Sequence, residues 1–193
     1  MGTQVKRLVS AMLLALALLP AHGQTAAIDP ALLTKANAGD AAAQVLIGDS
    51  YAAGSGQARN SKQLAEDYKQ AAEWYRKAAE KGDINAELRL AALYRDGRGV
   101  VRDMAQAAAW YRKAAEQGDA GAQATLGVLY SMGQGVPHDD VEAYYWLDLA
   151  ASVKGPDQQK YAANRQMIGT HITADELADV EERVAKWLAA HPR

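Results

Sequence analysis

The chain has 193 residues, with 21 basic and 23 acidic side chains, no cysteine and a formal net charge of −2. This length predicts a single domain. The charge balance argues against a nucleic-acid partner, which needs clustered positive charge, and the absence of cysteine excludes disulfides and thiolate metal sites.

Residues 1–23 have the layout of a secretory signal peptide. Two basic residues precede an apolar run of about 12 residues that Pro20 ends, and small residues stand where a signal peptidase cuts. A membrane anchor is the alternative, but a spanning helix needs about 20 apolar residues. We predict cleavage after Gly23, or alternatively after Ala27, and a flexible mature N-terminus at 24–28. The product, with 19 basic and 23 acidic residues and a net charge of −4, is expected to be periplasmic or secreted, without stable membrane insertion.

The first predicted helix of the mature chain covers residues 31–38. Asp29 and Pro30 precede it, and proline suits the first turn of a helix. We expect the helical repeat region to begin here and to extend over residues 29–155, ahead of C-terminal capping helices.

A pattern of residues then recurs along the chain. Gly-Asp pairs, tyrosines, Gly-x-Gly turns and tryptophans follow in the same order, and Trp74, Trp110 and Trp146 are each 36 residues apart. This period predicts an all-α solenoid of stacked helix pairs. Three repeats are expected, at about 36–81, 82–117 and 118–153. Because the tryptophans share one register, we interpret them as core residues rather than as ligand contacts.

The second repeat shows how each unit is built. Its first helix is expected after Asp83, which can cap it, and its end at Gly97, because glycine adopts the left-handed conformation that ends many helices. The second helix is expected from Asp103 to Gly118. Small residues three positions before each recurring tyrosine predict close helix packing. They are Gly48, Ala91 and Gly127.

The first repeat contains seven extra residues between Gly56 and Asp67. Seven residues are nearly two turns at 3.6 residues per turn. The insertion therefore predicts a longer second helix whose apolar face is not rotated, capped by Asn60 or Ser61; a loop is the alternative.

Two capping helices are predicted at the C-terminal end, within residues 156–190. They cover 157–167 and 173–189, and Thr173 with Glu176 has the pattern of a capping box. Terminal units of a solenoid are expected to differ from the internal repeats.

These motifs resemble the Sel-one-like (SEL1-like) repeat family, a branch of the tetratricopeptide-like superfamily, over roughly residues 35–155. In the second repeat, Glu87 and Ala91 stand where the family pattern has glutamine and glycine. The third repeat keeps Gly118-Asp119, Ala122-Gln123, Leu126-Gly127, Tyr130, Gly133, Gly135-Val136, Asp139, Ala143 and Trp146. The resemblance implies a right-handed α-solenoid of about three repeats with terminal caps, used as an adaptor or regulator in protein complexes. Cys-rich relatives are linked to β-lactams, but this chain lacks their cysteines.

No cluster of residues predicts catalysis. His138, Asp139 and Asp140 are explained by a helix-capping turn, and the Gly-x-Gly turns lack the lysine and preceding strand of a phosphate loop. We therefore predict no catalytic, cofactor-binding or metal-binding residues and no cofactor. Tyr144 is a candidate surface contact, and the Arg-Lys pairs after the first two tryptophans are interpreted as a solvated face.

A protein or peptide partner is expected on the first helices of the repeats, which the resemblance places on the concave surface. A groove there would suit an extended peptide or a helix. The candidate contacts are Leu46, Asp49, Arg89, Ala92, Asp96, Thr125, Val128 and Met132. The predicted function is a non-enzymatic protein-interaction adaptor or regulator of the bacterial envelope. The alternatives are a cell-wall-directed hydrolase or β-lactam-interacting relative, and a purely architectural subunit.

Overall fold

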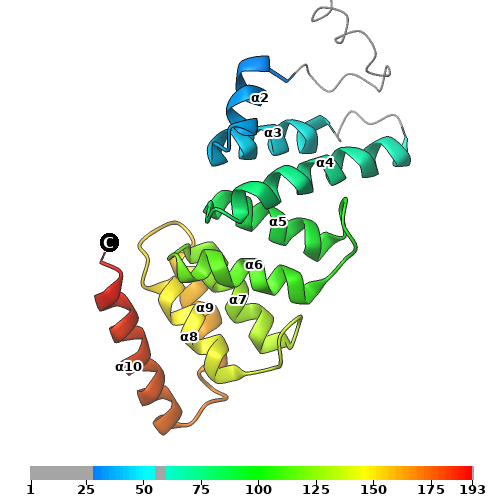
Figure 1. The fold of residues 1–193 in the computed structure, drawn as a ribbon. Coiled ribbons are helices and arrows are strands. Elements are labelled where there is room, and N and C mark those ends of the chain that lie inside the picture. Colours follow the sequence, from blue (N-terminus) through cyan, green and yellow to red (C-terminus); the bar gives the residue numbers. More distant parts are fainter. Residues whose placement is uncertain (1–27, 55–59, 193) are drawn as a thin grey trace, which may run out of the picture.

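The computed structural model describes residues 28–54 and 60–192, and within them all regular structure is α-helical. The predicted signal peptide lies outside the described residues. Figure 1 shows the helices in chain order. They are α2 (Pro30–Asn37), α3 (Ala41–Gly54), α4 (Ser61–Ala79), α5 (Ile84–Asp96), α6 (Met104–Glu116), α7 (Ala120–Met132), α8 (Asp140–Ala151), α9 (Gln158–Ile168) and α10 (Ala174–Ala190).

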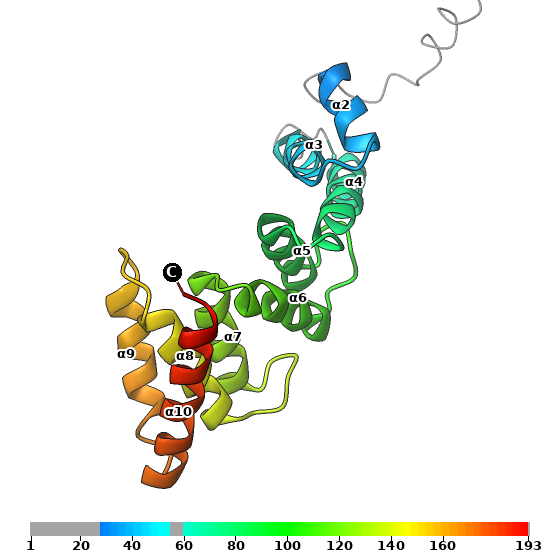
Figure 2. The same cartoon turned by 60° about the vertical axis from the view of Figure 1, so that its left-hand side comes forward.

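The helices form a curved stack of pairs. α3 packs with α4, α5 with α6 and α7 with α8, and each pair packs on the next one along the chain. α2 covers one end of the stack, while α9 and α10 pack on α8 at the other end (Figures 1 and 2). The expected all-α solenoid is confirmed.

The recurring glycines and aspartates mark the helix ends, as predicted. Asp83 Oδ1 accepts a hydrogen bond from the Ala86 amide at 2.9 Å, which satisfies one unpaired donor at the start of α5. α5 ends at Gly97, which has a φ of 69° that few other residues adopt without strain. The third repeat has the same cap and the same stop, so the helix pairs are defined by local chemistry.

Close packing at the predicted small residues is also confirmed. A Cβ on Gly127 would lie 2.7 Å from Leu147 Cγ and 2.9 Å from the Ala143 carbonyl oxygen, both on α8. A Cβ on Gly48 would lie 2.5 Å from Tyr75 Cε1. The two helices of these pairs approach closely because no side chain stands between them.

All three tryptophans pack against the hydrophobic core, as predicted, but of the three only Trp146 is buried. Trp146 is buried in a cluster that includes Val180 and Val184 of α10. Trp74 and Trp110 are half-buried, and a lysine three residues later places its Nζ 3.9 Å from each ring centroid. The difference arises because α10 packs on α8 beside the third tryptophan.

The arginines of the Arg-Lys pairs are not a simple solvated face. Arg76 Nη2 donates to the Tyr94 hydroxyl at 3.0 Å, and Arg112 donates in the same way to Tyr130. Each arginine belongs to a second helix and each tyrosine to the next repeat. These hydrogen bonds therefore join successive repeats.

Replacing Tyr94 by phenylalanine should lower the free energy of unfolding by about 1 kcal/mol, because the half-buried Arg76 loses its acceptor. Urea denaturation measures the change. Tyr51→Phe is the control, because the residue 18 positions before Tyr51 is Leu33 rather than an arginine. Equal losses in the two variants would contradict a role for the arginine.

The insertion in the first repeat lengthens α4, as predicted. α4 has 19 residues, whereas α6 has 13 and α8 has 12. Asn60 caps it, accepting from the Gln63 amide at 2.9 Å. Asp67 has the same repeat register as the cap residues Asp103 and Asp139, but it lies within α4 and not at its start. Its side chain is buried and accepts a hydrogen bond from Gln63 Nε2 at 2.8 Å. The helix thus begins two turns early; residues 55–59 lie outside the description.

The terminal helices have the predicted start signals. Asp29 Oδ1 accepts from the Ala31 amide at 2.9 Å, and Thr173 and Glu176 form the capping box at the start of α10. Arg183 of α10 pairs with Glu142 of α8, which adds an ionic contact to the apolar packing between these helices.

Candidate functional site

The eight candidate contact residues all lie at least partly at the surface of α3, α5 and α7. Two of them are large exposed apolar side chains, Leu46 at 52% and Met132 at 62% exposure. Ala92, Thr125 and Val128 are half-buried, so they contribute only part of their surface. The row is therefore open to solvent, and it combines four apolar residues with three charged ones and one threonine.

Asp49 and Arg89 form an ion pair within this row. Arg89 Nε lies 2.9 Å from Asp49 Oδ1, and the same oxygen accepts from the Tyr75 hydroxyl at 2.7 Å. Tyr75 is buried, and burial raises the pKa of its hydroxyl, with the Asp49 hydrogen bond adding to the rise. These three side chains join α3, α4 and α5, so Arg89 holds adjacent helices together as well as facing solvent.

Sequence reasoning missed Tyr75 as part of this surface. Its position directly after Trp74 is the available signal, because Tyr111 follows Trp110 in the same way and is also buried. A buried aromatic with a polar tip needs a hydrogen-bond partner, and here that partner is a candidate contact residue.

Asp96 lies at the end of the row, where it is the last residue of α5. Its carboxylate accepts from Arg95 Nε at 2.8 Å and lies 3.8 Å from Arg98 Nε. The hydrogen bond from Arg95, with the surrounding positive charge, lowers the pKa of Asp96. Both acidic candidates are thus already paired within the chain.

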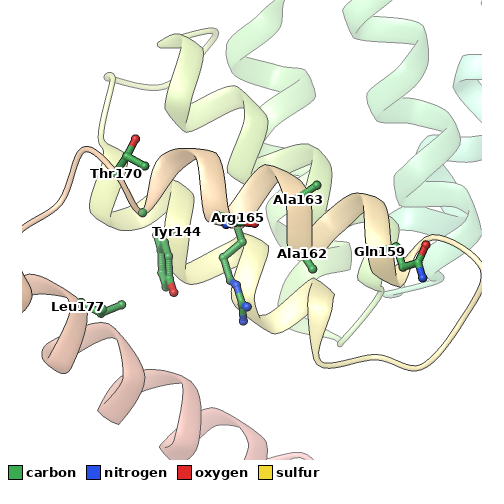
Figure 3. Close-up of a pocket in the computed structure, with 9 residues that line it drawn as sticks. Tyr144, Gln159, Ala162, Ala163, Arg165, Thr170 and Leu177 are labelled. Atoms are coloured by element: carbon green, nitrogen blue, oxygen red, sulfur yellow. The ribbon is translucent and has the colours of Figure 1, made fainter.

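Tyr144, the extra aromatic, lies half-buried at the C-terminal end of the stack. It lines a cavity of about 520 Å³ together with Arg165 and Gly169 of the α9 region and Leu177 of α10 (Figure 3). Arg165 is paired with Asp148, so its charge is compensated within the chain. Burial raises the pKa of the Tyr144 hydroxyl, which therefore stays protonated at neutral pH.

Near the start of α8, Asp139 caps the helix and Asp140 lies close to two histidines. Asp139 Oδ1 caps α8 by accepting from the Glu142 amide at 2.9 Å, as the capping interpretation predicts. Asp140 lies 3.4 Å from His138 Nε2 and 3.3 Å from His171 Nδ1. Across residues 28–54 and 60–192, no group of three or more histidine and carboxylate side chains is arranged to hold a metal ion.

Comparisons with known proteins agree with this geometry. The Sel1 repeat family model matches residues 41–83, 84–119 and 120–152. A protective antigen of uropathogenic Escherichia coli with an SLR fold is 30% identical over 82% of this chain, with a TM-score of 0.58. A Sel1 repeat protein from Oxalobacter formigenes is 39% identical over 63% of this chain and 88% of its own length, with a TM-score of 0.55. No curated protein matches in sequence.

The chain spans 40% of the length of the Escherichia coli antigen. None of the helices in the described part of the chain is long and apolar enough to cross a membrane.

Proposed function

We propose a function from one premise, that this chain belongs to the Sel1 repeat family. Sel1 repeat proteins generally mediate protein–protein interactions, and the repeat is typically a non-catalytic scaffold. The function supported best is that of a non-enzymatic adaptor or regulator that binds a protein or peptide along α3, α5 and α7. The composition of residues 1–23 supports action in the periplasm or outside the bacterial cell.

The exposed apolar side chains of this row are the observation that carries the proposal. Leu46 and Met132 expose large hydrophobic side chains on two first helices of a curved helical stack, and the half-buried Ala92 and Val128 share one repeat position with Asp49. Burial of such side chains by a partner is favourable by roughly 25 cal/mol per Å² of apolar surface. The internal pairing of Asp49 with Arg89 leaves apolar contact as the main source of affinity.

Replacing Met132 by lysine should abolish capture of the native partner from the periplasmic fraction or the medium. The substitution places a charge where apolar contact is expected, and Met132 lies at the surface, so the fold should persist. Met167→Lys is a matched control, because Met167 is also a methionine with 62% exposure but lies on α9.

Partner capture that survives Met132→Lys and Leu46→Lys would exclude this row as the binding surface. Detection of the chain only in the cytoplasm would separately exclude the proposed location. The two readouts are independent, so either part of the proposal can fail alone.

A further inference from the structure

The extension of α4 alters the surroundings of the turn between α5 and α6. In the third repeat, Gly135 packs on the first turn of α6, where a Cβ would lie 2.1 Å from the Met104 carbonyl oxygen. Gly99 makes the equivalent contact with α4, where a Cβ would lie 2.2 Å from the Tyr68 carbonyl carbon. Because α4 begins at Ser61, its first two turns extend past this contact and stand beside the turn (Figure 1).

A groove of about 390 Å³ lies between the extension and the turn. Leu64, Ala65 and Tyr68 of α4 form one wall, and residues 97–99 form the other. Leu64 is 39% exposed, so its side chain offers apolar surface to the groove rather than to the core.

Arg98 is the charged residue among those that line this groove. It lies 3.8 Å from Asp96, and its side chain remains 56% exposed. Asp96 accepts from Arg95 Nε at 2.8 Å, and Asp103 is the N-cap of α6. The three arginines and two aspartates of residues 95–103 leave an excess of one positive charge.

Arg98 is also held against the aromatic wall. Its Cζ lies 5.6 Å from the centroid of the Tyr68 ring, and its Nη1 donates to the Tyr68 hydroxyl at 3.5 Å. A guanidinium group held beside an aromatic ring is oriented before binding and can donate two parallel hydrogen bonds to a carboxylate.

The third repeat provides a comparison within the same chain. It has Ser131 at the end of α7 and Gln134 and His138 in the turn at the positions of the three arginines, and α6 has no extension beside it. The positive charge and the additional wall therefore occur together, at one turn of a chain whose formal net charge is −2.

We propose that this groove binds an acidic segment of a partner protein, with an aliphatic side chain against Leu64 and Tyr68 and a neighbouring carboxylate on Arg98. The positive charge of Arg98 favours an acidic over a basic segment. The apolar wall of Leu64 and Tyr68 requires that the segment also carry an aliphatic side chain. The groove adjoins the α3, α5 and α7 row at Asp96, which lies 3.8 Å from Arg98, but Leu64, Tyr68 and Arg98 themselves are not part of that row.

Selection from a random peptide library against the wild-type protein tests the proposal. We expect peptides in which aspartate or glutamate flanks leucine, isoleucine or valine, with an affinity that falls as salt concentration rises. Arg98→Glu should lower the affinity for these peptides by about tenfold or more, because it replaces an attractive ion pair by repulsion. Gln134→Glu, the same change at the equivalent position of the third repeat, should have no effect.

Deletion of residues 60–66 tests the role of the extension. It places Asp67 at the spacing of Asp103 and Asp139 from the preceding turn, so the shortened helix should be capped and the protein should fold. Peptide binding should be lost. If the deletion variant does not fold, Arg98→Glu and Leu64→Lys still decide the question, because both residues lie at the surface.

Selected peptides without acidic residues, or equal affinity for wild type and Arg98→Glu, would overturn the proposal. Sedimentation provides the remaining test, and a monomer is expected for both proteins. A wild-type dimer that Arg98→Glu dissociates would assign the groove to a second copy of the chain and would also overturn it.

Discussion

Replacing Gly127 by leucine is expected to lower the free energy of unfolding by about 3 kcal/mol, at the upper end of typical overpacking costs. The first atom of the new side chain would already lie 2.7 Å from Leu147 Cγ and 2.9 Å from the Ala143 carbonyl oxygen. The carbonyl belongs to the backbone of α8 and cannot rotate away. α7 and α8 must therefore separate, which disturbs the packing of the whole helix pair.

Gly121→Leu is the matched control, because Gly121 lies on the same helix but is exposed. A Cβ there would meet only the Asp119 carboxylate, 3.3 Å away, which needs to shift by a few tenths of an ångström. Leucine favours a helix over glycine by up to about 1 kcal/mol, so this variant should be as stable as the wild type or more stable. Chemical denaturation of both variants measures the difference, and an unchanged midpoint for Gly127→Leu would show that the close contact has no energetic importance.

Replacing Glu87 by glutamine is expected to stabilise the protein at neutral pH by about 1 kcal/mol, the typical net value of a buried hydrogen bond. Glu87 is only 2% exposed and accepts a hydrogen bond from Gln117 Nε2 at 2.9 Å. Burial raises the pKa of its carboxyl group, and the charge of Lys113 and the bond from Gln117 oppose this rise only in part.

The other two repeats show what a glutamine does at this position. Gln44 Nε2 donates to the Ala36 carbonyl at 2.9 Å, and Gln123 Nε2 donates to the Ala115 carbonyl at 3.1 Å. Each acceptor stands eight residues earlier, at the end of the preceding helix. An ionised Glu87 has no proton to donate to the carbonyl eight residues earlier. The side-chain amide of a glutamine at this position can donate one.

The pH dependence follows from the direction of the pKa shift. Because the pKa of Glu87 is higher in the folded protein than in the unfolded chain, its favourable contribution is present below the unfolded pKa. That contribution is lost as the pH rises through the folded pKa. Glutamine does not titrate, so the gain in melting temperature from Glu87→Gln should be larger at pH 7 than at pH 4. An equal gain at both pH values would contradict a titrating Glu87.

The helices and their ends were predictable because their signals are local. Asp83 and Asp119 cap amides three residues ahead, and Gly97 ends α5 through its own backbone conformation. The longer α4 was predictable for the same reason, since seven residues add two turns and leave the apolar face in register. These features require knowledge only of neighbouring residues along the chain.

The candidate surface was predictable in position but not in chemistry. Repeat register correctly placed Leu46 and Met132 on exposed faces of first helices. It did not reveal that Asp49 is held by Tyr75 and Arg89, because that contact joins three helices. Long side chains bind partners on other helices, and sequence spacing within one repeat does not define the distances between helices.

The sequence by itself determined the repeat period, the pairing of helices and the place where the first repeat departs from the others, because caps and apolar spacing act within a few residues. Only the tertiary structure decided how equivalent residues differ. Trp146 is buried beside α10 while Trp74 and Trp110 remain half-exposed under lysines, and Arg76 joins the next repeat instead of facing solvent. Burial and pairing depend on which helix lies alongside, and that neighbour changes from one end of the stack to the other.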